Sequence, residues 1–248
     1  MKAMIFAAGL GTRLRPLTNN IPKALVPVRG EAMLGRVIRK IQAAGVDEFV
    51  VNTHHFADKV GDYLKRNGDF GSHIAVSRED DGPLETGGGI KRAAPLLCSP
   101  QPGRFLVHNV DILSNLDVSW FIAQDAAGED CLASLLVCDA RDADRYLLFD
   151  SEMRLAGWTN IRTGEVKSPY PDFDPASCTR LSFCGIHILS PRVFALMEAW
   201  PDKFSIIDFY LSLAATEKIR AVRAPRGFRL IDIGSPDKLA QAELSGLE

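Results

Sequence analysis

The sequence predicts an α/β fold, a doubly wound and mostly parallel sheet with a small inserted β-lobe. Along the first half of the chain, short apolar strands alternate with amphipathic helices, as repeated β–α–β units do. At 146–160 this order gives way to short alternating strands around a turn, which is typical of a hairpin. The 248 residues are 46% hydrophobic and 24% charged, which is enough to bury a large core.

Four strands and two helices are predicted in the first half. The strands are expected at 3–8, 48–53, 73–79 and 104–113. A helix at 33–45 places Leu34, Val37, Ile38 and Ile41 on one face and ends at Gly45, and a second helix is expected at 56–68. Because the strands of such a sheet run in parallel, ligands are expected beyond their carboxyl ends.

The second half is expected to return to the same sheet after the hairpin. A polar, proline-rich connection occupies 171–180. The predicted elements that follow are a strand at 181–189, helices at 191–200 and 205–215, a strand at 228–234 and a final helix. The sequence shows no internal repeat, coiled coil or low-complexity tract.

Composition narrows the classes of partner. A net charge of −2 provides no global basic field, so neither nucleic acid nor an anionic membrane is an expected partner. The start "MKAMIFAAGLG" is too short for a signal-peptide core or a membrane span, and a cytoplasmic location is expected. Five cysteines with no CxxC pair favour reduced thiols. The oligomeric state, monomer or dimer, stays open.

The loop after the first strand fits neither standard nucleotide motif. In a GxGxxG fingerprint a third glycine would stand where Leu14 follows Gly9 and Gly11, and an acidic residue would end the second strand, which reads "VVNTHH". A P-loop needs lysine and a serine or threonine directly after its last glycine, and "GTRLRP" has neither. An NAD-dependent oxidoreductase is therefore disfavoured.

What remains is a long cationic loop in which three prolines resist helix formation. Glycine permits close backbone approach, so amides near Gly9 and Gly11 can turn toward an anion. Arg13 and Lys23 add positive charge that could hold a triphosphate and neutralise a leaving pyrophosphate. The plainer alternative is a solvated basic turn that closes a strand.

These residues carry a resemblance. "AAGLGTRLRPLT" followed by "PKALVPV" resembles the signature of the sugar-phosphate nucleotidyltransferases, and "PLETGGGI", "LVHNVDIL", "LSFCGIHILSP" and "RLIDIGSPDKL" extend the similarity along the chain. The resemblance implies a single nucleotidyltransferase domain over 1–248, Rossmann-like and GT-A-like, with a nucleotide-binding half at 1–140. The sugar-phosphate-binding half, at 141–248, would include the β-lobe. No hexapeptide repeats follow, so a catalytic-domain-only form is expected.

The reaction implied is attack of a sugar 1-phosphate oxygen on the α-phosphorus of a nucleoside triphosphate, with pyrophosphate as the leaving group. Such chemistry relies on positioning and charge stabilisation. The resemblance assigns catalytic roles to Arg13, Lys23, Asp111 and Asp232, and makes the two aspartates ligands of Mg²⁺. Taken singly, each aspartate could equally be a helix cap or a turn residue.

The resemblance also implies the binding residues. The nucleotide-binding set is Ala8, Gly9, Gly11, Thr12, Arg13, Lys23, Glu85 and Gly88, and the sugar-binding set is Asn109, Trp158 and Gly185. Glu85, in the loop "PLETGGGI", stands where a base-reading residue is expected. An ionised carboxylate only accepts hydrogen bonds, so it suits the ring N–H of uracil, thymine or guanine and disfavours cytosine and adenine. This inference fails if Glu85 faces solvent.

The chain departs from the family pattern in two places. Val110 replaces the usual glycine before the first metal aspartate and is expected to add bulk near the phosphates. "LAGWTN" replaces the Glu-Lys-Pro whose lysine holds the sugar phosphate, and Lys167 could supply that charge instead. Trp158 would either stack on a sugar or be a half-buried strand residue. Asp208 would either face the sugar or make a buried hydrogen bond.

Within the family, "PLETGGGI" is most similar to the uridylyltransferases that act on N-acetylmuramic acid 1-phosphate. Guanylyltransferases for mannose or heptose 1-phosphate are the runner-up. A noncatalytic sugar-nucleotide sensor on the same fold is the alternative of another class, and only Val110 favours it.

Overall fold

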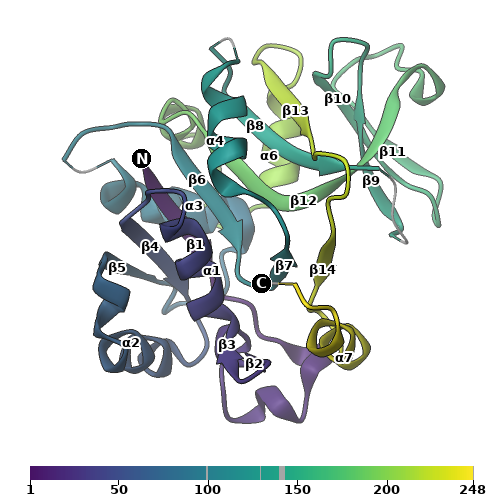
Figure 1. The fold of residues 1–248 in the computed structure, drawn as a ribbon. Coiled ribbons are helices and arrows are strands. Elements are labelled where there is room, and N and C mark those ends of the chain that lie inside the picture. The colour runs from purple at the N-terminus through teal and green to yellow at the C-terminus, as the bar shows by residue number, and fades with distance from the viewer. Residues whose placement is uncertain (99, 129, 140–142, 248) are drawn as a thin grey trace.

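The computed structural model describes residues 1–98, 100–128, 130–139 and 143–247, and a ten-stranded sheet dominates it (Figure 1). Its main path runs β11-β10-β9-β12-β6-β1-β4-β5, and β8 pairs with β12 and β13. The strands are β1 (Lys2–Phe6), β4 (Glu48–Thr53), β5 (His73–Arg78), β6 (Phe105–Asn109), β8 (Ala133–Cys138), β9 (Arg145–Phe149), β10 (Leu155–Asn160), β11 (Glu165–Lys167), β12 (Thr179–Leu189) and β13 (Ile219–Arg223).

The first half of the chain builds the parallel part of the sheet. β1 pairs in parallel with β4 on one side and β6 on the other, and β4 pairs in parallel with β5. The central strands β1, β4 and β6 are mostly buried because helices cover both faces. The predicted α/β fold is confirmed.

Two further two-stranded ladders and seven α-helices complete the described part of the chain. The ladders are β2 (Pro27–Val28) with β3 (Glu31–Ala32), and β7 (Ile112–Ser114) with β14 (Leu230–Asp232). The helices are α1 (Met33–Gln42), α2 (Ala57–Arg66), α3 (Glu85–Leu97), α4 (Val118–Ala126), α5 (Val193–Met197), α6 (Ile206–Leu213) and α7 (Pro236–Leu244).

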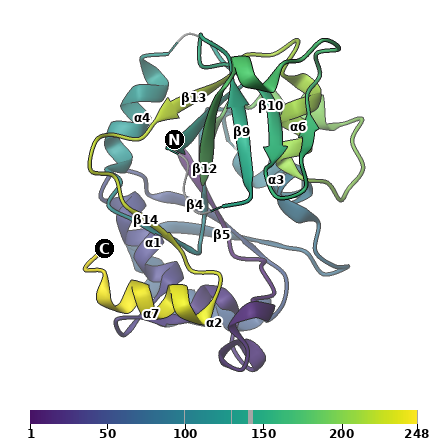
Figure 2. The same ribbon diagram turned by 90° about the vertical axis from the view of Figure 1, so that its right-hand side faces the viewer.

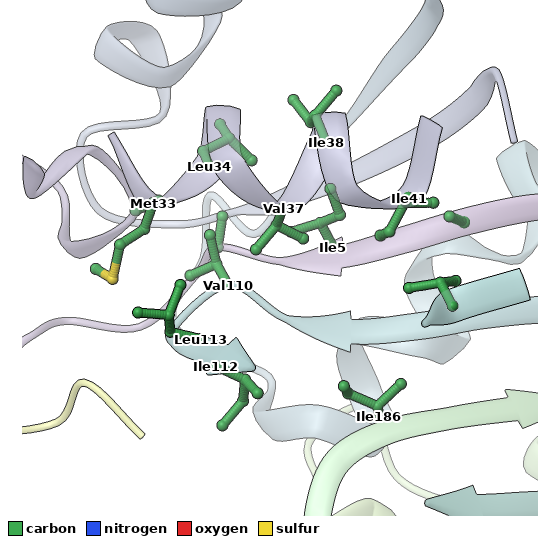
Figure 3. Packing of buried hydrophobic residues seen from close by; sticks show 14 of the residues in the cluster. Ile5, Met33, Leu34, Val37, Ile38, Ile41, Val110, Ile112, Leu113 and Ile186 are labelled. Carbon is green, nitrogen blue, oxygen red and sulfur yellow. The ribbon is translucent and has the colours of Figure 1, made fainter. Parts of the chain in front are cut away.

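The core lies on both faces of the sheet because neighbouring strand residues point to opposite sides. Ala3 and Ile5 of β1 pack into one cluster with α1, α2 and α4, and Met4 packs into the other with α3, α5 and α6. Figure 3 shows the first cluster, with Val37 of α1 beside Ile5 and Val110. The apolar residues of α1 recur at helical spacing, so one face of the helix is buried.

The second half adds antiparallel strands. β12 runs antiparallel to β6, β8 and β9, and β10 runs antiparallel to β9 and β11. The predicted hairpin is therefore present, and its turn is closed by Asp150 Oδ1, which accepts the backbone N–H groups of Glu152 and Arg154 at 2.9 and 2.8 Å. The resulting β-lobe lies beside α6 (Figure 2).

Some predicted boundaries were wrong. The strand expected at 104–113 is two elements, because β6 ends at Asn109 and the chain turns before β7 pairs with β14. The segment "PLETGGGI" is the start of α3 rather than a loop. α4, β8 and β13 had not been predicted.

The half-domain boundary expected at residue 140 lies outside the described residues and stays a prediction. The sheet crosses it, since β12 pairs with β6 and β8 from the first half. Among the described residues no helix is both long and apolar enough to span a membrane.

Candidate active site

Two adjoining cavities make up the candidate site, and the first of them lies at the carboxyl ends of the parallel strands. The first, called here the strand-end cavity, has a volume of about 260 Å³. Because β1, β4 and β6 are parallel neighbours, the residues that end them meet at one edge. The cavity is lined by Phe6, Ala8, Gly9, Leu10, Lys23, Asn52, Glu79, Pro83, Glu85, Thr86, Asn109, Val110 and Asp111.

The second, called the lobe cavity, has a volume of about 620 Å³ and is bounded by the β-lobe and the start of α6. It is lined by Glu85, Ala143, Arg145, Tyr146, Leu147, Trp158, Glu165, Lys167, Ser182, Phe183, Ser205, Ile207, Asp208 and Asp232. Glu85 lines both cavities, so they adjoin there. A third cavity, between α1 and the start of α4, shares no lining residue with either.

The loop between β1 and β2, residues 7–26, is called here the glycine loop. It contains three 3₁₀ helices, η1 (Thr12–Leu14), η2 (Leu17–Asn19) and η3 (Lys23–Leu25). Gly11 has φ +63°, and a Cβ there would lie 2.9 Å from Thr18 Cγ2 and 3.1 Å from Lys23 Cβ. Thr18 Oγ1 donates to the Gly11 carbonyl at 2.7 Å. Gly9 differs, since a Cβ there would make only an ordinary contact with Lys23, at 3.8 Å.

Lys23 and Asp111 form an ion pair inside the strand-end cavity. The Lys23 side chain is 10% exposed and that of Asp111 is 23% exposed. Water screens such a pair weakly, so its charges act strongly on any ligand placed beside them. The structure thus joins two residues that the sequence placed 88 positions apart.

The side chains of Arg13 and Asp232 both lie close to Gly234. A Cβ at Gly234 would be 2.6 Å from Arg13 Nη2 and 3.3 Å from Asp232 Oδ1, so glycine makes room for both. Ile233 N–H donates to the Asp111 carbonyl at 2.8 Å, and Asp232 pairs with Ile112 across the β7–β14 ladder. The two aspartates therefore occupy neighbouring positions on paired strands.

This arrangement fits a divalent cation whose ligands come partly from the protein and partly from the substrate. The described residues contain no cluster of three or more His, Cys, Asp or Glu side chains that could hold a metal ion. Asp111 and Asp232 offer two hard carboxylates, and Mg²⁺ commonly takes one or two carboxylates and completes its shell with phosphate oxygens and water. The donor set suits Mg²⁺ bound together with a nucleotide.

The floor of the strand-end cavity is a buried polar cluster. Asn52, at the end of β4, is fully buried, and its Nδ2 donates to Glu79 Oε1 at 2.8 Å. Glu79 is 3% exposed, and its Oε2 accepts the Leu84 N–H at 2.9 Å. A Cβ at Gly89 would lie 2.9 Å from Glu79 Oε1, so this glycine of α3 leaves space for the carboxylate. Asn52 Oδ1 is buried without a hydrogen-bond partner.

Trp158 and Lys167 face each other across the β10–β11 pair in the lobe cavity. The Lys167 ammonium lies 5.2 Å from the centre of the Trp158 ring and 3.3 Å from Asp208 Oδ1. Asp208 is thus exposed toward the cavity, and not part of a buried hydrogen bond. An aromatic face beside charged groups is a usual arrangement for sugar binding.

Comparison with known proteins identifies the family. A family model described as nucleotidyl transferase matches residues 2–168. The chain belongs to the nucleotidyl transferase family.

Known relatives match along nearly the whole of this chain. The N-acetylmuramate alpha-1-phosphate uridylyltransferase of Caulobacter vibrioides is 35% identical over 247 residues, 97% of this chain and 95% of the relative. A probable mannose-1-phosphate guanylyltransferase of Arabidopsis thaliana is 30% identical over 95% of this chain and 62% of the relative. The crystal structure of HddC from Yersinia pseudotuberculosis complexed with GMP-PN superposes with a TM-score of 0.75 at 25% identity, covering 98% of each chain.

Most of the predicted residues of this nucleotidyl transferase line the two cavities. Ala8, Gly9, Lys23, Asn109 and Asp111 line the strand-end cavity, Trp158 and Asp232 line the lobe cavity, and Glu85 lines both. Thr12 and Arg13 lie on the exposed helix η1. Glu85 is itself exposed, and its φ of +62° lies in the left-handed region that non-glycine residues seldom adopt.

Three predicted glycines, Gly11, Gly88 and Gly185, line neither cavity, and the last two serve packing. A Cβ at Gly88 would lie 2.0 Å from the Asp202 carbonyl, so Gly88 lets α3 approach that backbone. Gly185 has φ +71°, and a Cβ there would lie 2.8 Å from Asn109 Nδ2. Gly185 therefore makes room for a side chain of the strand-end cavity.

Val110 lines the strand-end cavity, so the expectation that it adds bulk near the phosphates stays a prediction. Val110 is also 5% exposed and belongs to the core cluster under α1 (Figure 3). Its side chain therefore contributes both to the core and to the cavity wall. Asn52, Glu79 and Arg145 had not been predicted, although Asn52 ends a strand parallel to β1 and could have been found from that position.

Proposed function

We propose that this protein transfers the uridylyl group of UTP to N-acetylmuramate 1-phosphate, forming UDP-N-acetylmuramate and pyrophosphate. The observation that carries the proposal is the 35% identity to the Caulobacter vibrioides uridylyltransferase along nearly the full length of both chains. The two adjoining cavities support it, because a nucleotide and a sugar phosphate must be held side by side.

The residues divide the work between the two substrates. The strand-end cavity takes the nucleotide, with Lys23 and Arg13 beside the triphosphate. The lobe cavity takes the sugar, with Trp158 on the ring. Asp111 lines one cavity and Asp232 the other, so the reacting phosphates meet at the junction. The sugar phosphate oxygen attacks the α-phosphorus there, and the bond to the β-phosphate breaks as pyrophosphate leaves.

Asp111 and Asp232 would hold Mg²⁺, which supplies positive charge to the phosphates when it is bound. Lys23 is paired with Asp111 inside the strand-end cavity, which supports a role of its ammonium beside the phosphates. Arg13 neutralises the departing pyrophosphate from the exposed side of the loop. Little reorganisation of charge is then needed during the reaction.

Glu85 is the proposed acceptor for the ring N–H of the base. Glu85 is exposed, yet it lines both cavities, so this role requires that the bound base cover its carboxylate. A base with a ring acceptor at that position would leave two acceptors facing each other, at a cost of about 1–3 kcal/mol. UTP, dTTP and GTP should therefore be used, and CTP and ATP should be poor.

A cytoplasmic location belongs to the same proposal, supported by five cysteines outside any disulfide.

The test crosses five nucleoside triphosphates with the 1-phosphates of N-acetylmuramate, N-acetylglucosamine, mannose and heptose, read by release of pyrophosphate. UTP with N-acetylmuramate 1-phosphate should give the highest kcat/KM. Preference for GTP with mannose 1-phosphate would instead establish the runner-up, which the similarity to the Arabidopsis thaliana guanylyltransferase supports. Efficient use of CTP or ATP would exclude the role of Glu85.

A further inference from the structure

We propose that Arg145 selects an acidic sugar, its guanidinium binding a carboxylate carried by the sugar 1-phosphate. The inference rests on the proposed function, because N-acetylmuramate differs from N-acetylglucosamine only by a lactyl ether that ends in a carboxylate. Arg145 begins β9 and lines the lobe cavity.

Strand register places Arg145 on the cavity face of the lobe. Leu147, Trp158 and Lys167 form one row across β9, β10 and β11. Arg145 stands two residues before Leu147 and therefore on the same face, about 7 Å further along the strand. A pyranose ring that stacks on Trp158 would span that distance, with one substituent reaching toward Arg145.

The charges of the cavity leave Arg145 available for a ligand. Arg145 and Lys167 are the two cationic residues in the described lining. Lys167 is held by Asp208 at 3.3 Å and by Glu165 at 3.9 Å. The Arg145 guanidinium makes no ion pair or hydrogen bond with the described part of the chain, and the neighbouring Asp144 pairs with Arg162 at 3.2 Å.

A carboxylate needs such a partner in this cavity. The lining includes the carboxylates of Glu85, Glu165, Asp208 and Asp232, which repel a second negative group on the sugar. Arginine presents two parallel N–H donors that match the two oxygens of a carboxylate. A neutral sugar offers this fork only hydroxyl acceptors, which arginine binds less strongly than a carboxylate. Arg145 is therefore the group on the cavity wall that distinguishes an acidic sugar from its neutral counterpart.

The test compares kcat/KM for N-acetylmuramate 1-phosphate and N-acetylglucosamine 1-phosphate in the full chain and in three variants. Arg145→Gln should lower the ratio of the two values by about tenfold or more, mainly through KM for the acidic sugar, because a charge-assisted hydrogen bond is lost. Arg145→Lys should lower it less, since the charge remains without the fork. Arg154→Gln, on the same lobe but outside the cavity lining and paired with Glu152, should leave the ratio unchanged.

Each outcome bears on one claim. If wild type uses N-acetylmuramate 1-phosphate and Arg145→Gln slows both sugars equally, the proposed function stands and the role of Arg145 is overturned. If wild type does not use N-acetylmuramate 1-phosphate, the proposed function fails and the inference falls with it. Where N-acetylglucosamine 1-phosphate supports no turnover, its Ki as a competitor is compared with the Kd of N-acetylmuramate 1-phosphate, and Arg145→Gln should reduce the difference between these two constants.

Discussion

Asn52 and Glu79 are joined by a hydrogen bond of 2.8 Å between Nδ2 and Oε1 in the floor of the strand-end cavity. The second oxygen of Glu79 accepts the Leu84 N–H, directly before α3 begins at Glu85. One buried carboxylate thus ties the end of β4 to the start of α3. The position of Glu85 at the rim of both cavities depends on this link.

Glu79→Ala should destabilise the protein and weaken UTP binding together. The change leaves the Asn52 amide and the Leu84 N–H without an acceptor, which costs about 1–3 kcal/mol. Urea denaturation measures the loss of stability, and calorimetric titration with UTP measures the loss of affinity. Asp81→Ala serves as the control, because Asp81 is only two residues from Glu79 and its side chain is exposed. This variant should change neither the stability nor the UTP affinity. Equal UTP affinity in wild type and Glu79→Ala would show that the link does not position the cavity.

Asp111→Asn should lower turnover by orders of magnitude while the fold persists. The amide removes the charge of the proposed Mg²⁺ ligand and the ion pair with Lys23. Steady-state assays across a range of Mg²⁺ concentration measure the effect. Asp117→Asn is the matched control, because asparagine also caps helices and Asp117 caps α4. Near-normal activity of Asp111→Asn would remove the residue from the catalytic set.

The two glycines of the loop should respond differently to alanine. Gly11→Ala forces a left-handed backbone on a residue with a side chain and brings its Cβ to 2.9 Å from Thr18 Cγ2. Gly9→Ala meets only an ordinary contact at 3.8 Å. Thermal unfolding and UTP affinity should therefore fall clearly in Gly11→Ala, and Gly9→Ala should keep its stability. A larger loss of thermal stability in Gly9→Ala than in Gly11→Ala would contradict this account of the loop.

Two buried histidines should make stability fall in mild acid. Burial lowers the pKa of His108 to about 4 and that of His187 to about 3, from an ordinary value of 6.5. The unfolded chain takes up protons below pH 6.5 while the folded chain does not, so the free energy of unfolding falls as the pH falls toward the folded values. From pH 6 to pH 5 the two histidines together should cost about 2 kcal/mol.

Urea denaturation at each pH measures this slope. His187→Gln should roughly halve it, whereas the exposed His73→Gln should leave it unchanged. Stability that is constant between pH 6 and pH 5 in wild type would contradict the burial of both neutral imidazoles.

The site residues at the strand ends could be predicted from the sequence. Hydrophobic periodicity located β1, β4 and β6, and parallel pairing then brings Asn109 and Asp111 to the glycine loop. The α4 and β8 elements did carry signals that were missed, the Asp117 cap and the apolar run at 133–138. The places of β8 and β13 in the sheet are set by tertiary pairing with β12 and with β8.

Roles that depend on burial could not be read from the sequence. Glu79 stands in a row with Asp80 and Asp81, and only the fold shows that Glu79 alone of the three is buried. Gly88 and Gly185 lie in recognisable motifs, yet each is required by a neighbour that comes close in space and lies far away in sequence. Arg145 stands at the start of a lobe strand, and its access to a cavity follows from strand register.

The most direct test of the account is mass-spectrometric analysis of the product that the purified chain forms from UTP and N-acetylmuramate 1-phosphate with Mg²⁺. The account predicts UDP-N-acetylmuramate and an equal amount of pyrophosphate, both nearly absent with Asp111→Asn. Binding of UTP without formation of any nucleotide sugar from the panel of sugar 1-phosphates would contradict it.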